Sequence, residues 1–204
     1  MKKIIALAAS AVSLVMSGGM ASAATVQLDS HLFNGSDFTF SYGGTLAPTE
    51  GVTAGSQLVI LDFAGYVAGS IFSPYGFISA TTEFTTSGTL VDPSVTDDPN
   101  IVNLVFTYTG PDFHTTPSPG LPYTPIDFTG LTARSTIGSV VLDGFSTLTI
   151  KNEGTAVGSV VYSAGLVGVP GPIPEPATWA LMIMGMGTVG VAMRRRSART
   201  ISFA

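Results

Sequence analysis

An alternation of apolar and polar residues, with a period of two, constrains the fold of this chain more than any other feature. Residues 38–42 alternate aromatic with hydroxyl-bearing side chains, and residues 102–108 alternate large apolar side chains with Asn103, Val105 and Thr107. This period is typical of β-strands that bury one face. Further candidate strands are 26–28, 57–63, 76–84, 128–134, 139–142, 146–151 and 156–162. Eight or nine short strands predict an all-β ectodomain, an antiparallel β-sandwich or jelly roll.

Residues typical of turns separate these segments. They are Asn34-Gly35, Gly43-Gly44, Asp143-Gly144 and 152–154. No stretch between residues 24 and 170 has the period of an amphipathic helix. We therefore predict one β domain over residues 24–169. It is long enough for a single core, and because the chain has no cysteine it folds without disulfides.

The last segment, residues 170–204, has three parts in a fixed order. Prolines at 170, 172, 174 and 176 favour extended backbone, residues 177–193 are apolar and uncharged, and arginines follow. Seventeen residues form a helix of roughly 25 Å, which is at the short end of what spans a bilayer. The stretch has no polar face. We therefore predict that residues 177–193 form a transmembrane helix rather than a helix buried in the soluble fold.

Basic residues set the orientation of this predicted span. Arg194, Arg195 and Arg196 follow it directly, and arginines beside a span stay on the cytoplasmic side. The β domain is therefore expected outside the membrane. Trp179 lies near the translocated end, where an indole suits the interface; the alternative is that it simply adds apolar surface there.

The last segment carries Pro174-Glu175-Pro176 and Trp179-Ala180 before the apolar stretch and the arginine triplet. In this order these parts resemble the PEP-CTERM sorting signal, in the variant whose motif reads PEP-x-x-Trp-Ala. The resemblance covers only about the last thirty residues. It implies that an exosortase, a membrane-embedded enzyme similar to cysteine transpeptidases, recognises Pro174, Glu175 and Pro176 and cuts at or near them. The alternative is a permanent single-pass anchor. The residues from Ser197 to Ala204 extend beyond the point where many members end.

The first residues, 1–23, have the three regions of a secretory signal peptide. A basic start is followed by about a dozen apolar residues and then by Ala21-Ser-Ala23, which predicts cleavage after Ala23. The Sec export machinery is the expected partner. A retained N-terminal anchor is disfavoured because the apolar run is short.

Charge excludes one class of partner for the exported part. Between Ala24 and Pro172 there are twelve acidic side chains against Arg134 and Lys151, which leaves a net charge of −10. Such a surface repels nucleic acid and anionic membrane, so no nucleic-acid role is expected.

Few residues suggest catalysis or cofactor binding. His31 and His114 are far apart in sequence, and the chain has no nucleophile elbow and no zinc-protease motif. Gly185–Gly190 matches a dinucleotide-binding pattern without its strand, helix or acidic residue, so no cofactor is expected. The acidic loop 92–100 offers oxygen ligands for calcium but lacks the EF-hand pattern, and an exposed acidic turn is the simpler interpretation. We expect no metal site.

These observations predict an exported, non-enzymatic protein. It would sit transiently in the inner membrane with its C-terminus in the cytoplasm, and then reach the cell surface or extracellular matrix. The resemblance implies an association with exopolysaccharide and biofilm, and hence a structural or adhesive role. A secreted polysaccharide hydrolase with two paired carboxylates is the alternative. The same tail also occurs on proteins labelled ice-binding, but only Thr107-Tyr-Thr109 and Thr147-Leu-Thr149 match the Thr-x-Thr arrays expected of that function.

Overall fold

The computed structural model describes residues 24–85, 95–114, 124–152, 156–172, 182–189 and 193–194. The predicted signal peptide, with Ala21 and Ala23 at its cleavage site, lies outside the described residues. So do residues 173–181, which hold the Pro-Glu-Pro motif.

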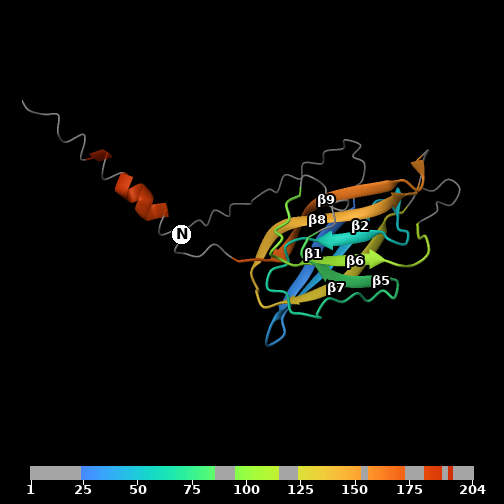
Figure 1. The fold of residues 1–204 in the computed structure, drawn as a ribbon, viewed down its shortest axis with the longest axis horizontal. Helices are drawn as coiled ribbons and strands as arrows, with labels where there is room; N and C mark the ends of the chain where they lie inside the picture. The colour runs from blue at the N-terminus through green and yellow to red at the C-terminus, as the bar shows by residue number, and fades with distance from the viewer. Residues whose placement is uncertain are drawn as a thin grey trace, which may run out of the picture.

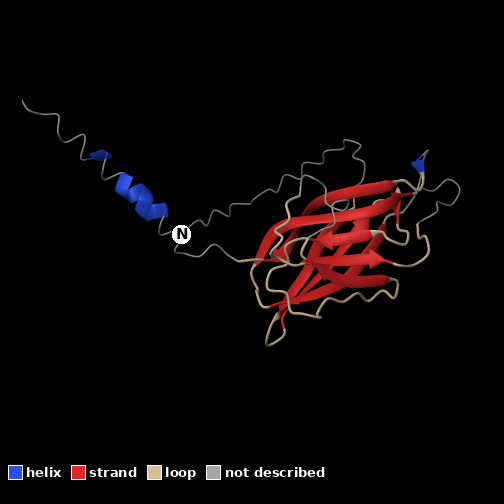
Figure 2. Cartoon of the chain, viewed as in Figure 1, coloured by secondary structure: helices blue, strands red, loops and turns tan. Residues whose placement is uncertain are grey.

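The described part of the domain is built from β-strands that pair antiparallel throughout (Figures 1 and 2). The strands are β1 (Thr25–Phe33), β2 (Phe38–Leu46), β3 (Glu50–Gly51), β4 (Gln57–Ile60), β5 (Ile78–Glu83), β6 (Asn103–Tyr108), β7 (Ile126–Ser135), β8 (Val140–Lys151) and β9 (Val160–Pro170). The predicted all-β, antiparallel class is confirmed.

These strands form two sheets. The smaller has the order β1-β2-β7, and the larger runs β9-β8-β4-β6-β5, with the short β3 beside the end of β8. β9 pairs with β8 over eleven residue pairs, the longest ladder of the larger sheet. The last strand of the domain is therefore fixed along its whole length.

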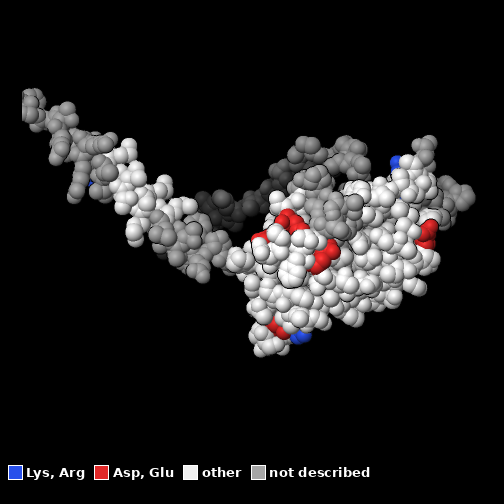
Figure 3. Space-filling model, in the orientation of Figure 1, with Lys and Arg blue, Asp and Glu red and all other residues white. Residues whose placement is uncertain are grey.

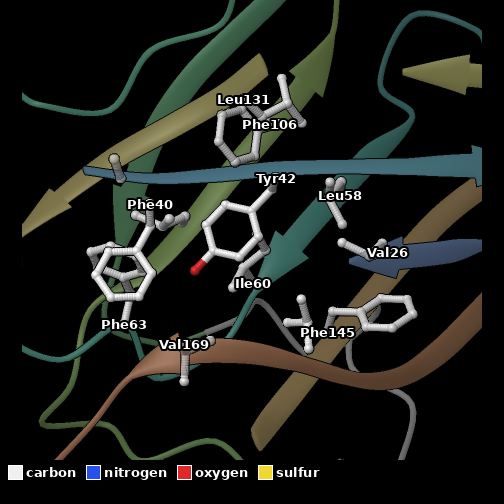
Figure 4. Close-up of a cluster of buried hydrophobic side chains, with 13 residues drawn as sticks. Val26, Phe40, Tyr42, Leu58, Ile60, Phe63, Phe106, Leu131, Phe145 and Val169 are labelled. Atoms are coloured by element: carbon white, nitrogen blue, oxygen red, sulfur yellow. The ribbon is translucent and has the colours of Figure 1, made fainter. Parts of the chain in front are cut away.

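The core lies between the two sheets (Figure 4). Alternate residues of each strand point inward, which is why the period-two pattern was readable in the sequence. The smaller sheet contributes Phe40, Tyr42 and Leu131, and the larger sheet contributes buried residues from four strands: Leu58, Ile60, Leu104, Phe106, Phe145, Val167 and Val169. Every buried residue of this cluster lies between Val26 and Val169, so the domain contains its own core.

Two of the predicted turns are wrong. Gly43-Gly44 lies inside β2 and Asp143-Gly144 lies inside β8. These glycines allow close approach rather than chain reversal, since a Cβ on Gly44 would come within 2.1 Å of the Thr25 carbonyl oxygen. The predicted strands 139–142 and 146–151 are consequently one continuous strand, β8.

The other turns and strand ends follow the sequence more closely. Gly35 has φ 104° in the β1–β2 turn, where the Asn34 amide donates to the Asp37 carbonyl at 2.9 Å, so the predicted Asn-Gly turn is confirmed. The strand predicted over 156–162 instead begins at Val160 and continues to Pro170. The turn predicted at 152–154 follows β8, and residues 153–155 of it lie outside the described residues.

Candidate functional site

The folded domain ends in a hydrogen-bonded closure at Gly171. The Pro170 carbonyl accepts from the Ala64 amide at 3.2 Å, and the Gly171 amide donates to the Ser139 carbonyl at 3.1 Å. The Ser139 hydroxyl donates in turn to the Gly171 carbonyl. Gly171 is buried, whereas Pro172 is exposed. The fold therefore ends between these two residues.

Packing makes glycine the suitable residue at this closure. A Cβ on Gly171 would lie 2.3 Å from Cγ2 of Val141, a separation that requires the structure to shift. Val169, two residues earlier, is fully buried in the core. The chain is thus held by core packing up to the last residue of the fold.

Only two residues separate this closure from the Pro-Glu-Pro motif. An extended, proline-rich chain advances about 3.1 Å per residue, so Pro174 lies within roughly 10 Å of Gly171. The predicted recognition residues Pro174, Glu175, Pro176, Trp179 and Ala180 lie outside the described residues.

Part of the predicted membrane segment is helical. Residues 182–189 form a helix with exposed side chains, and Met193 and Arg194 are also helical, whereas Arg195 and Arg196 lie outside the described residues. Thr188 donates its hydroxyl proton to the Gly185 carbonyl at 2.8 Å, which satisfies a polar group within the helix. No helix in the described part of the chain is both long and apolar enough to cross a membrane, so the span over residues 177–193 stays a prediction.

An acidic cluster lies near the closure. Asp62 is two residues from Ala64 and has a φ of 52°, a left-handed conformation that aspartate tolerates. Its carboxylate accepts from the Asp98 amide at 3.0 Å, and its own amide donates to Oδ1 of the fully buried Asn103 at 2.9 Å. Figure 3 shows acidic side chains gathered at the end of the domain where the chain leaves toward its C-terminus.

Burial favours protonation of Asp62 and Glu83 in this cluster. Burial raises the pKa of Asp62 to about 6, the hydrogen bond from the Asp98 amide opposes this rise, and the carboxylates of Asp143, Asp97 and Asp98 add to it. Burial, together with the nearby Asp97, also raises the pKa of Glu83. Burial is thus the main cause of these two raised pKa values, whereas hydrogen bonds from Asn100 lower the pKa of Asp98.

The described carboxylates of the cluster accept hydrogen bonds from neighbouring amides. Asp97 accepts from the side-chain amide of Asn103 at 2.9 Å, and Asp98 accepts from the backbone and side-chain amides of Asn100 at 3.0 and 2.9 Å. Among the described residues, no three His, Asp or Glu side chains are placed to hold a metal ion. Residues 92–94 of the acidic loop fall outside this part of the chain.

The two histidines occupy unrelated surroundings. His31 in β1 stacks on Phe40 with ring centroids 5.7 Å apart, and His114 lies against Gly51. In the described ranges neither imidazole is hydrogen-bonded to a carboxylate. The structure thus does not join either histidine to an acid in the way that catalysis by a His–acid pair requires.

A hollow lies beside β8 and β9. Most of its lining residues are small or apolar, and its one carboxylate, on Asp143, accepts from the Gly144 amide at 2.7 Å. The lining residues are Val95, Thr96, Asp143, Gly144, Ala164, Gly165 and Leu166. Glycoside hydrolysis of the usual kind uses two carboxylates, and this lining supplies one.

Sequence reasoning missed the closure at Gly171. The predicted domain boundary after residue 169 assigned Pro170 and Gly171 to the sorting segment, yet both are bonded to the fold. A usable signal was present, because Val167 and Val169 continue the period-two pattern up to Pro170.

Comparison with known proteins adds one finding. The family described as PEP-CTERM protein-sorting motif matches residues 172–196, beginning at the first residue beyond the closure. No curated protein and no solved structure gives a significant match. The chain carries a PEP-CTERM sorting motif, which implies an exosortase as its processing partner and export to the cell surface or extracellular space.

Proposed function

We propose that this protein is an exported, non-enzymatic component of the cell surface or extracellular matrix, whose working part is the β domain. One observation carries the proposal: the sorting motif starts at residue 172, one residue beyond the closure of the fold at Gly171. Removal of the tail beyond the motif would leave the domain complete, because its core lies between Val26 and Val169. The folded domain and the sorting motif therefore occupy separate, adjacent parts of the chain.

The route to the surface has three proposed steps. The Sec machinery exports the chain and the signal peptide is removed after Ala23. Residues 177–193 then hold the chain in the inner membrane, with Arg194–Arg196 in the cytoplasm. An exosortase finally cuts at or near Pro174–Pro176 and releases or transfers the domain. The helical residues 182–189, whose side chains are exposed and apolar apart from Thr188, support the second step.

A structural or adhesive role within exopolysaccharide is the work we propose for the mature domain. The acidic surface, with its net charge of −10 between Ala24 and Pro172, suits a hydrated matrix and disfavours nucleic acid. The hollow beside β9 has a single carboxylate in its lining, which favours binding over hydrolysis.

Mass spectrometry of both termini tests this proposal. We expect the exported protein to begin at Ala24 and to end near Pro176, and full-length protein to accumulate in the inner membrane in a strain without the exosortase. Pro174→Ala with Pro176→Ala should reproduce that accumulation. Pro172→Ala removes an exposed proline at the first residue of the family match but outside Pro174–Pro176, and it serves as the matched control, with normal processing expected. An exported protein that still ends at Ala204 would refute the proposal.

A further inference from the structure

Strand β5 (Ile78–Glu83) is the terminal strand of the larger sheet. It pairs with β6 along one edge, and among the described strands none lies beyond its other edge. An open strand edge presents unpaired backbone N–H and C=O groups and can add a strand from another chain.

The pairing register identifies which groups are open. The Thr109 amide donates to the Phe77 carbonyl at 2.7 Å, so the odd-numbered residues of β5 bond toward β6. The backbone groups of Ala80 and Thr82 consequently point to the opposite edge. The Ile78 amide also points there but is already bonded to the Tyr75 carbonyl at 3.1 Å.

The usual protections of an edge strand are missing from β5. The sequence Ile78–Glu83 contains no proline and no lysine, and its ladder with β6 has no register shift. In the described part of the chain no hydrogen bond to the backbone of Ala80 or Thr82 is found. Exposed aromatic residues flank the strand, with Phe77 59% and Phe84 58% exposed.

We propose that the β5 edge binds the β5 edge of a second copy of this chain, antiparallel and around a two-fold axis through Thr81. In this register Ala80 lies opposite the second copy's Thr82, so both open residues of each copy are paired and four backbone hydrogen bonds form. Each Phe84 comes opposite an Ile78. This inference rests on the strand edge alone and holds whether or not the tail is processed.

Charge also favours this register. Glu83 is the one charged residue of β5, and it comes opposite Ser79 of the second copy rather than opposite the other Glu83. The contact is small, so the association is weak for free domains. Display of many copies on one surface would raise their effective concentration.

Cysteine substitution gives a sharp test, because the chain has no cysteine of its own. Thr81 faces itself across the axis as a non-hydrogen-bonded pair, whose Cα atoms lie about 4.5 Å apart, within disulfide range. Residues 24–172 with Thr81→Cys should form a covalent dimer under mild oxidation. Ser79→Cys, equally exposed but opposite Glu83, is the matched control and should stay monomeric.

Charge substitutions test the same register by sedimentation equilibrium. Ser79→Lys creates two ion pairs with Glu83 and should tighten the dimer about fivefold, while Ser79→Glu opposes carboxylates and should weaken it by a similar factor. Ser30→Lys and Ser30→Glu, on the exposed part of β1, should change nothing. Circular dichroism melts establish that each variant folds. The proposal is overturned if the domain stays monomeric up to millimolar concentration, if Ser79→Cys cross-links as well as Thr81→Cys, or if both charges at Ser79 shift the dimer equally.

Discussion

Replacement of Tyr42 by phenylalanine should make this protein more stable. Tyr42 in β2 is fully buried between the two sheets, and Figure 4 shows its hydroxyl pointing into the apolar cluster. Within the described residues this hydroxyl has no hydrogen-bond partner. A buried hydroxyl without a partner costs about 1–3 kcal/mol, and phenylalanine keeps the ring that fills the site. We expect Tyr42→Phe to raise the free energy of unfolding by about 1 kcal/mol and the melting temperature by about 2–4 °C.

The same substitution should change the alkaline limit of stability. Burial raises the pKa of Tyr42 above its usual value of 10. Above pH 10 the unfolded chain releases this proton while the folded chain keeps it, so the stability of the native protein falls as pH rises. The slope reaches about 1.4 kcal/mol per pH unit for one group. Tyr42→Phe lacks the group, and its advantage over the native protein should therefore widen above pH 10.

Urea unfolding of residues 24–172, followed by circular dichroism at pH 7 and at steps above pH 10, measures both effects. Tyr66→Phe is the matched control, because the Tyr66 hydroxyl accepts from the Ile71 amide at 3.4 Å and its loss should be neutral or destabilising. If Tyr42→Phe lowered stability at pH 7, or if its curve ran parallel to that of the native protein above pH 10, the hydroxyl would have a partner and the reasoning would be refuted.

Two further substitutions test the exit from the fold and the acidic cluster. Gly171→Ala should destabilise the domain by about 1–3 kcal/mol, because its methyl group meets Val141, whereas Pro172→Ala should leave urea unfolding unchanged. Asp62→Asn should stabilise the domain at pH 7 by no more than about 1 kcal/mol, since the folded carboxyl has a pKa of about 6 and is partly solvated. The unfolded carboxyl ionises near pH 4, so this gain should disappear below pH 4 and grow as pH rises to 6; a gain independent of pH would contradict the assignment.

Alternation in the sequence predicted the class of fold because each strand buries one face. Phe40 and Tyr42 lie on the inner face of β2, as their spacing indicates. The turns predicted at Gly43-Gly44 and Asp143-Gly144 were wrong because glycine is used both in turns and where strands approach closely. Gly44 sits beneath Thr25 and Phe128 in the middle of a sheet, and its neighbours come from distant parts of the chain. No local pattern carries that information.

The candidate site could likewise be predicted only in part from the sequence. The order of proline motif, apolar stretch and arginines is local, so the sorting signal could be predicted from residues alone. The bond between Ser139 and Gly171 joins residues 32 positions apart, and the edge of β5 exists only because of the strand order. Both features depend on the order of strands in the sheets, and the strand pattern in the sequence is compatible with several such orders.

The closure at Gly171 limits how a processing enzyme can reach the motif. Five residues separate it from Ala177, where the predicted span begins, and six residue steps of extended proline-rich chain reach only about 19 Å. On the proposed route, an exosortase that cuts near Pro174–Pro176 would therefore work within about 19 Å of the closure. The end of the domain that carries Ser139 and Gly171 would then face the enzyme. A last strand that frayed would lengthen this tether, and we propose that the long β8–β9 ladder keeps it short.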